Sequence, residues 1–195
     1  MPQGGWGGRI CVGGAGSSAI LQPMWSSWFR RRPRPRLQVL MVCAGNLCRS
    51  PMAEAVLRSK LAGAGLDAVV AVDSAGTHGF KRGARPDPRA AAQAAARGYR
   101  LDSIRSRPLE ADDFTRFDLL LAMDLANLAA LTERCPAQQR HRLALLLPFD
   151  PASTTDEVPD PYFGNVQGFD TALDLIMPAC DHLVAHLRQR LEGPA

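Results

Sequence analysis

The sequence predicts an α/β protein in which helices cover both faces of a parallel sheet. Short apolar runs of strand length alternate along the chain with amphipathic or alanine-rich segments of helical length. Hydrophobic residues make up 46% of the 195 residues, which is enough for one core. The first apolar run leads directly into a short loop that contains glycine, asparagine, two cysteines and arginine. Because parallel sheets bind ligands at the carboxyl ends of their strands, we expect a binding site at this loop.

The first two predicted elements enclose this loop. Residues 37–42 form an apolar run typical of a buried strand, and residues 52–61 have the composition of a helix. Ser50 and Pro51 indicate a helix start, because a hydroxyl caps the first turn and proline suits the first helical position. The N–H groups of a helix start lack partners and carry partial positive charge, so we expect the loop to bind an anion.

The rest of the chain continues the alternation. Further strands are predicted over residues 68–72, 118–123 and 143–147, and further helices over residues 89–97, 125–134 and 166–191. The strand segments are apolar runs, the first of these helices is alanine-rich and ends at Gly98, and Asp124 is placed to cap the second. The last helix has one apolar face at three- and four-residue spacing, and we expect Pro178 to kink it or to remove one hydrogen bond.

The amino-terminal 36 residues differ from the rest in composition. They contain six arginines and no lysine, aspartate or glutamate, together with seven of the seventeen glycines and all three tryptophans. Subtracting these six charges from the net charge of +4 leaves −2 for residues 37–195. We therefore expect a disordered extension over residues 1–36 and one globular domain over residues 37–195. The nearly neutral domain gives no electrostatic support for nucleic-acid binding.

The five cysteines are odd in number and dispersed, which argues against a disulfide framework and favours a reducing cytoplasm. No pair of Cys-x-x-Cys motifs and no close cluster of histidine and cysteine suggests a zinc site. No apolar run reaches the roughly 18 residues that a membrane span requires. We therefore expect a cytoplasmic domain without a membrane span or a metal centre.

The loop after the first strand has the composition of a phosphate site with a nucleophile. Cys43 lies six residues before Arg49 and close to the helix start, where the helix dipole favours a thiolate. Arg49 offers two parallel N–H donors to a tetrahedral oxyanion, which a lysine cannot match. Ser50 can donate its hydroxyl to the thiolate, Gly45 allows close approach of the backbone, and Asn46 tolerates a left-handed turn. The expected phosphate-binding residues are Ala44, Gly45, Asn46, Leu47, Cys48, Arg49 and Ser50.

This loop, together with Asp160-Pro161-Tyr162 much later in the chain, resembles the low-molecular-weight protein tyrosine phosphatase family. Four further segments occur in that family's order and at similar spacing, namely residues 73–77, 86–89, 107–109 and 123–128. The resemblance covers residues 37–192. It implies a doubly wound, flavodoxin-like sheet of four parallel strands. It also implies a phosphatase that needs no cofactor or metal and acts on phosphotyrosine-containing proteins.

The resemblance also implies a two-step reaction. Cys43 attacks phosphorus and forms a phosphocysteine, while Arg49 and the loop amides hold the phosphoryl oxygens. Asp160 protonates the leaving oxygen and then takes a proton from the hydrolytic water, which agrees with the demands of phosphoryl transfer. Without the cysteine loop, an aspartate between two prolines is more often a turn residue. Asp124 is better explained as a helix cap than as a catalytic group.

Three aromatic residues are candidates for the wall of a phenyl pocket. Tyr162 and Phe163 follow the acid in sequence, and Phe80 resembles the family's other aromatic wall by position. Ser74 resembles the serine that orders the loop asparagine. The family often has a histidine where this chain has Ile104, and that departure leaves the hydrogen-bonded support of the loop open.

Two other functions are compatible with such a loop. Thioredoxin-coupled arsenate reductases have a similar loop but need two further cysteines close together after the third strand, and residues 123–127 contain none. A non-catalytic phosphoprotein-binding module would keep the anion loop without turnover, although nucleophile, arginine and acid are all present. Cys48 either traps oxidised Cys43 as a reversible disulfide or only packs. Hydrolysis of an aryl phosphate distinguishes the phosphatase from the non-catalytic binding module.

Overall fold

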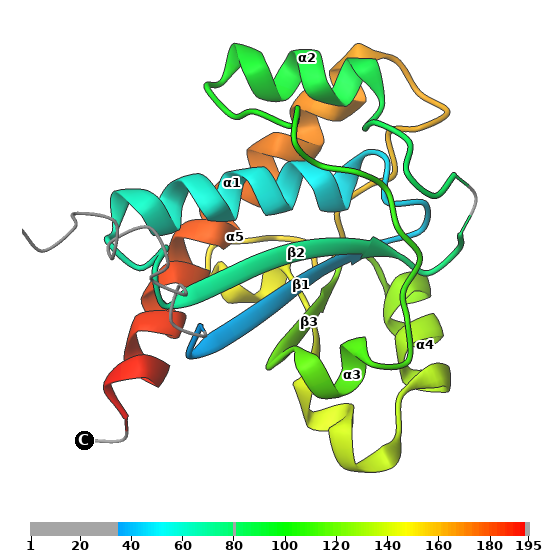
Figure 1. Ribbon diagram of the computed structural model, residues 1–195. Coiled ribbons are helices and arrows are strands. Elements are labelled where there is room, and N and C mark those ends of the chain that lie inside the picture. Colours follow the sequence, from blue (N-terminus) through cyan, green and yellow to red (C-terminus); the bar gives the residue numbers. More distant parts are fainter. Residues whose placement is uncertain (1–34, 80, 194–195) are drawn as a thin grey trace, which may run out of the picture. The chain divides into compact units, whose positions relative to one another are not determined.

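The structure is a computed structural model that describes residues 35–79 and 81–193, and in it strands alternate with helices (Figure 1). The strands are β1 (Leu37–Cys43), β2 (Val70–Gly76), β3 (Leu119–Ala122) and β4 (Leu143–Leu145). The α-helices are α1 (Arg49–Gly63), α2 (Pro88–Ala96), α3 (Asp113–Arg116), α4 (Leu125–Arg134) and α5 (Val166–Glu192). The short 3-10 helices η2 (Ala137–Arg142) and η3 (Leu147–Phe149) flank β4. The extension predicted for residues 1–36 lies outside the described residues, except for its last two.

The four strands run parallel in the order β2-β1-β3-β4. β1 therefore pairs with β2 on one side and with β3 on the other, and the direction of winding reverses between β1 and β3. This is the doubly wound, flavodoxin-like arrangement that the resemblance implies. In such sheets the reversal point is where ligands bind, and the loop after β1 lies there.

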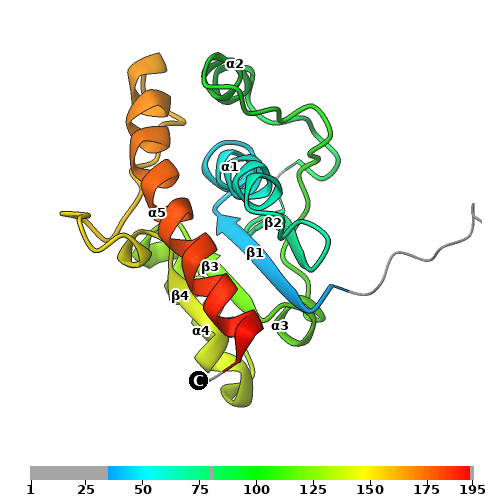
Figure 2. The same cartoon turned by 90° about the vertical axis from the view of Figure 1, so that its left-hand side faces the viewer.

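Helices cover both faces of the sheet (Figure 2). α1 and α5 cover one face, with α2 packed on both of these helices, while α3 and α4 cover the other. Successive residues of β1 alternate between the two: Val39 and Met41 pack under α1 and α5, whereas Leu40 and Val42 pack against the α3 and α4 side. A strand that is buried on both faces has no polar side, which explains why residues 39–42 are all apolar, whereas Gln38 lies in the less buried start of the strand.

The first helix begins earlier than the sequence predicts. α1 starts at Arg49, so that Cys48 is the N-cap and Ser50 lies inside the first turn. No side chain caps this end of the helix. The Ser50 hydroxyl is directed instead to Cys43, whose Sγ lies 3.0 Å from Ser50 Oγ. The predicted capping function of Ser50 is therefore wrong, because its hydroxyl lies next to the Cys43 sulfur instead.

The two edge strands also differ from their predictions. β2 runs to Gly76 instead of ending at residue 72, and an edge strand, which is paired on one side only, tolerates the polar residues 73 and 74. β4 ends at Leu145 instead of residue 147. Pro148 has no N–H for a ladder, and the chain folds there as η3.

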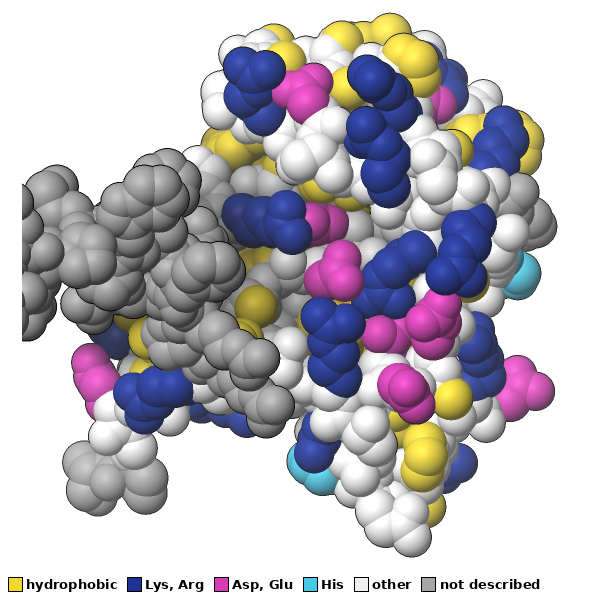
Figure 3. Space-filling view, viewed as in Figure 1, with side chains coloured by type: hydrophobic (Ala, Val, Ile, Leu, Met, Phe, Trp, Pro, Cys, Tyr) yellow, Lys and Arg dark blue, Asp and Glu magenta, His cyan; other side chains and the backbone are white. Residues whose placement is uncertain are grey.

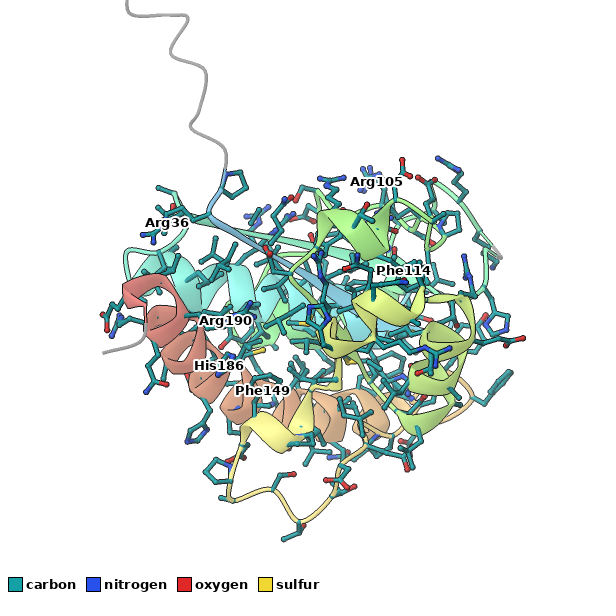
Figure 4. All side chains as sticks on the ribbon, turned by 90° about the horizontal axis from the view of Figure 1, so that it is seen from below. Arg36, Arg105, Phe114, Phe149, His186 and Arg190 are labelled. Carbon is teal, nitrogen blue, oxygen red and sulfur yellow. The ribbon has the colours of Figure 1, made fainter. Side chains whose placement is uncertain are left out.

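α5 runs without interruption through Pro178, and its predicted apolar face is buried. The buried residues of this helix are Phe169, Ala172, Leu173, Ile176, Ala179, Cys180, Leu183, Val184 and Leu187. Near the end of the helix, His186 meets Phe149 edge to face, with ring centroids 5.3 Å apart (Figure 4). This contact joins α5 to η3 beside the amino end of β3, far along the sheet from the Cys43 loop.

The surface of the described residues carries mixed charge. Figure 3 shows Lys and Arg side chains beside Asp and Glu side chains over much of one face. Some exposed charged side chains are paired, such as Arg82 with Glu110 and Arg100 with Asp102. None of the described helices is long and apolar enough to cross a membrane.

Candidate active site

The loop after β1 is held in place from outside through its carbonyl groups. The hydrogen bonds, in chain order, join Cys43 O to Thr77 N (2.9 Å), Ala44 O to His78 N (2.9 Å), Gly45 O to Ser106 Oγ (3.2 Å) and Leu47 O to Asp87 N (2.8 Å). The donors come from the end of β2 and from the segments before and after α2. Four carbonyl groups of the loop are therefore directed away from its centre.

The N–H groups of the same loop show the opposite pattern. Within the described part of the chain, no hydrogen bond uses the N–H of any residue from 44 to 49 as its donor. These groups lead into the N-terminus of α1, a helix of 15 residues whose dipole adds positive potential. Consecutive unpaired N–H groups at a helix start form a cradle for an anion. The arrangement favours the phosphate site predicted for residues 44–50.

Asn46 organises the centre of the loop. Its side chain is fully buried, and its φ of +53° is the only positive φ outside glycine among the described residues. Its Nδ2 donates to Ser50 Oγ at 3.0 Å and to Ser74 Oγ at 2.8 Å, and its Oδ1 accepts from the Arg107 N–H at 2.9 Å. Asparagine adopts the left-handed conformation at lower cost than most residues. Ser74 therefore contacts the residue that the resemblance assigns to it.

Behind the loop, Glu54 of α1 supports Ser74. The Glu54 side chain is buried, accepts a hydrogen bond from the Ser74 hydroxyl and pairs with Arg58 at 2.7 Å. Burial raises the pKa of Glu54 to about 7, against the opposing effects of Arg58 and Ser74. A hydrogen-bonded chain thus runs from Glu54 through Ser74 to Asn46.

The two cysteines of the loop have different surroundings. Cys43 ends β1, and its sulfur lies within hydrogen-bond distance of the Ser50 hydroxyl. Burial raises the pKa of the Cys48 thiol to about 12, and the nearby Asp87 carboxylate adds to the effect. Cys48 is therefore a neutral thiol at physiological pH and cannot replace Cys43 as a nucleophile.

Arg49 joins two later segments of the chain to the loop. Its side chain is only 3% exposed. Its Nη1 contacts Asp124 Oδ2 at 2.5 Å and donates to the Val158 carbonyl at 2.9 Å, and its Nη2 contacts Asp160 Oδ2 at 2.6 Å. Asp124 also caps α4, as predicted, since its Oδ1 accepts from the Asn127 N–H at 2.6 Å. The structure thus brings Asp160 to the loop through Arg49.

The loop opens into a cavity of about 450 Å³. Residues of the cysteine loop line this cavity, together with Lys81, Asp160, Tyr162 and Phe163. The rings of Tyr162 and Phe163 meet edge to face with centroids 5.0 Å apart, and Phe163 is 97% exposed. Exposed aromatic rings beside an anion cradle suit a phosphorylated phenyl group. Phe80, the third predicted aromatic, lies outside the described residues.

Sequence reasoning gave no function to several residues that support the loop. A Cβ at Gly76 would lie 2.9 Å from the Ala44 carbonyl oxygen, so only glycine fits beneath the loop at this point. Ser106 and the Arg107 N–H bond to the loop, while Ile104 is buried in the core next to them in sequence. Polar support therefore comes from residues 106 and 107, whatever the residue at 104. Gly76 and Arg107 both lie in segments that carry the family resemblance, and that resemblance was the feature of the sequence that could have identified them.

The remaining described cysteines do not form a relay with Cys43. Cys135 packs in the cluster on the α3 and α4 side of the sheet, whereas Cys180 of α5 packs in the cluster on the opposite side. Burial raises the pKa of both thiols. Neither residue lines the cavity. This placement removes the main requirement of a cysteine-relay reductase from the described part of the chain.

The described residues contain no cluster of three or more histidine, cysteine, aspartate or glutamate side chains that is placed to hold a metal ion. The charged groups beside the loop are instead one arginine and two aspartates. The arrangement can hold an anion through backbone donors and a guanidinium, with a sulfur nucleophile on one side and a carboxyl group on the other.

Comparison with known proteins gives one family. Residues 38–192 match the model of the low molecular weight phosphotyrosine protein phosphatase family. A low molecular weight protein-tyrosine-phosphatase of Streptomyces coelicolor is 42% identical over 161 residues, which cover 81% of this chain and 98% of that protein. The human low molecular weight phosphotyrosine protein phosphatase is 34% identical over 144 residues, which cover 73% of this chain and 90% of that protein.

Solved structures give the same result. A protein tyrosine phosphatase from Entamoeba histolytica superposes with a TM-score of 0.75 at 39% identity, covering 78% of this chain and 97% of that one. YfkJ from Bacillus subtilis superposes with a TM-score of 0.75 at 32% identity, covering 81% of this chain and 97% of that one. The family model alone covers the cysteine loop, the segment that carries Asp160 and nearly all of the sheet, because it matches residues 38–192. The chain therefore belongs to the low molecular weight phosphotyrosine protein phosphatase family.

Proposed function

We propose that this protein is a protein tyrosine phosphatase that hydrolyses phosphotyrosine through a phosphocysteine intermediate. The observation that carries the proposal is that Cys43, Arg49 and Asp160 line one cavity beside N–H groups that have no acceptor among the described residues. The names of the relatives in the same family support phosphatase activity. The proposal needs no cofactor, since nucleophile, anion site and acid all come from the chain.

In the first step, the Cys43 thiolate attacks phosphorus. A sulfur–phosphorus bond forms and the bond from phosphorus to the tyrosine oxygen breaks, with the proton of Asp160 passing to that oxygen. The loop N–H groups and Arg49 hold the equatorial oxygens, where a loose transition state carries its charge. A phosphoryl oxygen then accepts the hydrogen bond that Arg49 Nη2 otherwise gives to Asp160. Asp160 is thereby released from the guanidinium and can donate its proton to the leaving group.

In the second step, water attacks the phosphocysteine. Asp160, now a carboxylate, takes a proton from the water as the new phosphorus–oxygen bond forms and the sulfur–phosphorus bond breaks. Cys43 leaves as a thiolate, which the hydroxyl of Ser50, 3.0 Å away, stabilises by donating a hydrogen bond. Inorganic phosphate is the product, and the protonated acid is ready for the next cycle.

The proposed substrates are phosphotyrosine-containing proteins. Tyr162 and Phe163 stand beside the cavity, and their exposed rings can pack on a phenyl group that reaches the phosphate loop. Phosphoserine is shorter and offers no ring, so its phosphate gains nothing from these contacts. We assign this activity to the domain over residues 37–195 in the cytoplasm, where its free cysteines remain reduced.

The test is hydrolysis of p-nitrophenyl phosphate and of matched phosphotyrosine and phosphoserine peptides, with Cys43→Ser as control. We expect hydrolysis of the two aryl substrates, little hydrolysis of phosphoserine, and no turnover by Cys43→Ser. The variant keeps Arg49 and the loop amides, so it should still bind vanadate or phosphate. Trapping of a ³²P-labelled protein by acid quench would identify the phosphocysteine.

The same measurements separate the alternatives. Phosphate binding without hydrolysis by the unaltered protein would favour a phosphoprotein-binding module. Arsenate reduction that depends on thioredoxin, without hydrolysis of aryl phosphates, would favour a reductase.

For the domain assignment, deletion of residues 1–36 should leave kcat and the melting temperature nearly unchanged, and a large loss of either would show that the domain starts earlier.

A further inference from the structure

The segment that carries Asp160 is connected to α2 by one arginine. We call residues 160–164 the acid loop and residues 43–49 the phosphate loop. Arg89, in the first turn of α2, donates from Nη2 to the Tyr162 carbonyl at 2.9 Å and from Nη1 to the Gly164 carbonyl at 3.1 Å. The Tyr162 N–H in turn donates to Asp160 Oδ1 at 3.1 Å. Arg89 is thus two hydrogen bonds away from the proposed acid.

The other side of the same guanidinium is held by Asp87. Arg89 Nε and Nη2 donate to the two oxygens of Asp87 at 3.0 and 2.9 Å, and Asp87 also caps the helix, because its Oδ1 accepts from the Arg89 N–H at 2.8 Å. These contacts lower the pKa of Asp87, which therefore stays charged. The Asp87 N–H donates to the Leu47 carbonyl of the phosphate loop at 2.8 Å. A planar guanidinium suits such two-sided binding, and a lysine cannot reproduce it.

Aromatic contacts fix the orientation of this arginine. Its guanidinium carbon lies 4.8 Å from the ring centroid of Phe169, which is fully buried in α5, and 6.0 Å from that of Tyr162. Both distances are within the range of a cation–π contact. The guanidinium therefore lies where α2, α5 and the acid loop meet.

From these contacts we infer that Arg89 is a positioning residue that sets the acid loop at a fixed distance from the phosphate loop. The inference rests on the proposed function, because it concerns the delivery of the Asp160 proton. Arg89 itself does not line the cavity and contacts neither the nucleophile nor the leaving group. Its effect is on the geometry of proton transfer, so its loss should matter most where the leaving group needs that proton.

The structure also offers a matched control. Arg97, at the other end of α2, pairs with Asp170 at 3.1 Å and with Asp174 at 2.5 Å. It links α2 to α5 as Arg89 does, and its side chain is 25% exposed against 36% for Arg89. Among the described residues, none of the hydrogen bonds or ion pairs of its side chain goes to the acid loop or the phosphate loop. Arg97→Met therefore removes a comparable link between the helices without changing the geometry of the acid.

The experiment compares kcat/KM for phenyl phosphate, whose leaving group is strongly basic, with kcat/KM for p-nitrophenyl phosphate. This parameter reports the steps up to phosphoenzyme formation and excludes the hydrolysis that both substrates share. Since misplacing a catalytic group by about 1 Å can cost ~10²-fold, Arg89→Met should lower the phenyl phosphate value roughly tenfold more than the p-nitrophenyl phosphate value. Arg97→Met should leave the ratio unchanged, and Arg89→Lys should restore only part of it.

A double-mutant cycle completes the test. In an Asp160→Asn background, Arg89→Met should cause no further loss that depends on the leaving group, because the two residues act on one proton transfer. Equal losses on both substrates, in protein whose melting temperature is intact, would overturn the inference and leave Arg89 as a structural link. The inference would also fail if Arg97→Met changed the ratio of the two kcat/KM values as much as Arg89→Met does. If the unaltered protein hydrolyses neither substrate, the proposed function fails instead, and if Asp160→Asn shows no dependence on the leaving group, the assignment of the acid fails.

Discussion

Two arginines near the carboxyl edge of the sheet each pair with two aspartates, yet they have different surroundings. Arg49 is 3% exposed, and one of its partners, Asp160, is 46% exposed in the cavity. Arg107 is 22% exposed, and its partners are Asp73 and the buried Asp113. The same set of groups therefore occurs once beside the nucleophile and once in the support behind it.

The difference lies in which partners can be exchanged. Arg107 directs Nε and Nη2 to Asp73 and Nη1 and Nη2 to Asp113, so both carboxylates are held by paired donors. Arg49 gives each carboxylate one nitrogen, and one of these carboxylates is open to solvent. In the proposed reaction a phosphate displaces the solvent-exposed Asp160 from Arg49, whereas Asp113 is buried against Arg107. Under the proposed function, the position of an arginine relative to the cavity, and not its ion pairs, gives it a function in binding.

The largest expected effect is that of Arg49→Lys. Lysine keeps the charge and loses the two parallel donors, and an arginine that stabilises a phosphoryl transition state contributes about 10³–10⁵-fold in kcat. We expect kcat for p-nitrophenyl phosphate to fall by roughly 10³-fold or more, with a small change in melting temperature. Arg107→Lys, its counterpart, should retain most of kcat. Similar losses of kcat in both variants would contradict the distinction between the two arginines.

Next in size is the effect of Asp160→Asn compared with Asp124→Asn. Both aspartates contact the same guanidinium, but only Asp160 lines the cavity. Loss of acid catalysis typically costs 10²–10⁴-fold, and we expect a loss of about that size in the pre-steady-state cleavage of phosphotyrosine by Asp160→Asn. The loss should be smaller for p-nitrophenyl phosphate, whose leaving group is a weaker base. If Asp124→Asn is the variant whose loss depends on the leaving group, the two aspartates have been assigned the wrong way round.

For Arg107→Met the expected effect is on stability. Removing the guanidinium leaves the carboxylates of Asp73 and Asp113 close together without a partner, and breaking a buried ion pair in this way costs about 3–5 kcal/mol. Because Asp73 is about one third exposed, we expect a loss near the lower end of this range. Urea unfolding followed by circular dichroism measures it. An unchanged denaturation midpoint would show that solvent replaces Arg107 without cost.

The smallest expected effect is the pH dependence that Glu54 causes. Burial raises the pKa of Glu54 from 4.5 to about 7, so the folded protein binds a proton that the unfolded chain releases. This contribution to stability is complete below pH 4.5 and is lost as the pH rises to about 7. Glu54→Gln should flatten the dependence in urea titrations between pH 5 and 8. A variant with the same slope as the unaltered protein would assign the dependence to another group.

Much of this protein can be read from local sequence. Residues 39–42 are all apolar because β1 is buried there on both faces, and Asp124 precedes α4 as a cap. The loop from Cys43 to Ser50 carries its chemistry in adjacent residues, so its composition indicates an anion site and a nucleophile. In each case the interacting residues are close along the chain, so the local sequence pattern alone is sufficient to predict the strand, the helix cap or the anion site.

Tertiary structure decided the rest, because the relevant neighbours are far apart in sequence. Arg49 meets Asp160, 111 residues later, only because the chain returns over the carboxyl ends of β1 and β3. Ser50 has the features of an N-cap, but α1 begins one residue before it. Its hydroxyl therefore lies next to the sulfur of Cys43, the proposed nucleophile. β2 extends through two polar residues because it is an edge strand, and Arg89 joins the acid loop to α2 through carbonyl groups that no side-chain pattern reveals. Local chemistry thus determined which groups are present, and the packing of distant segments determined which of them meet.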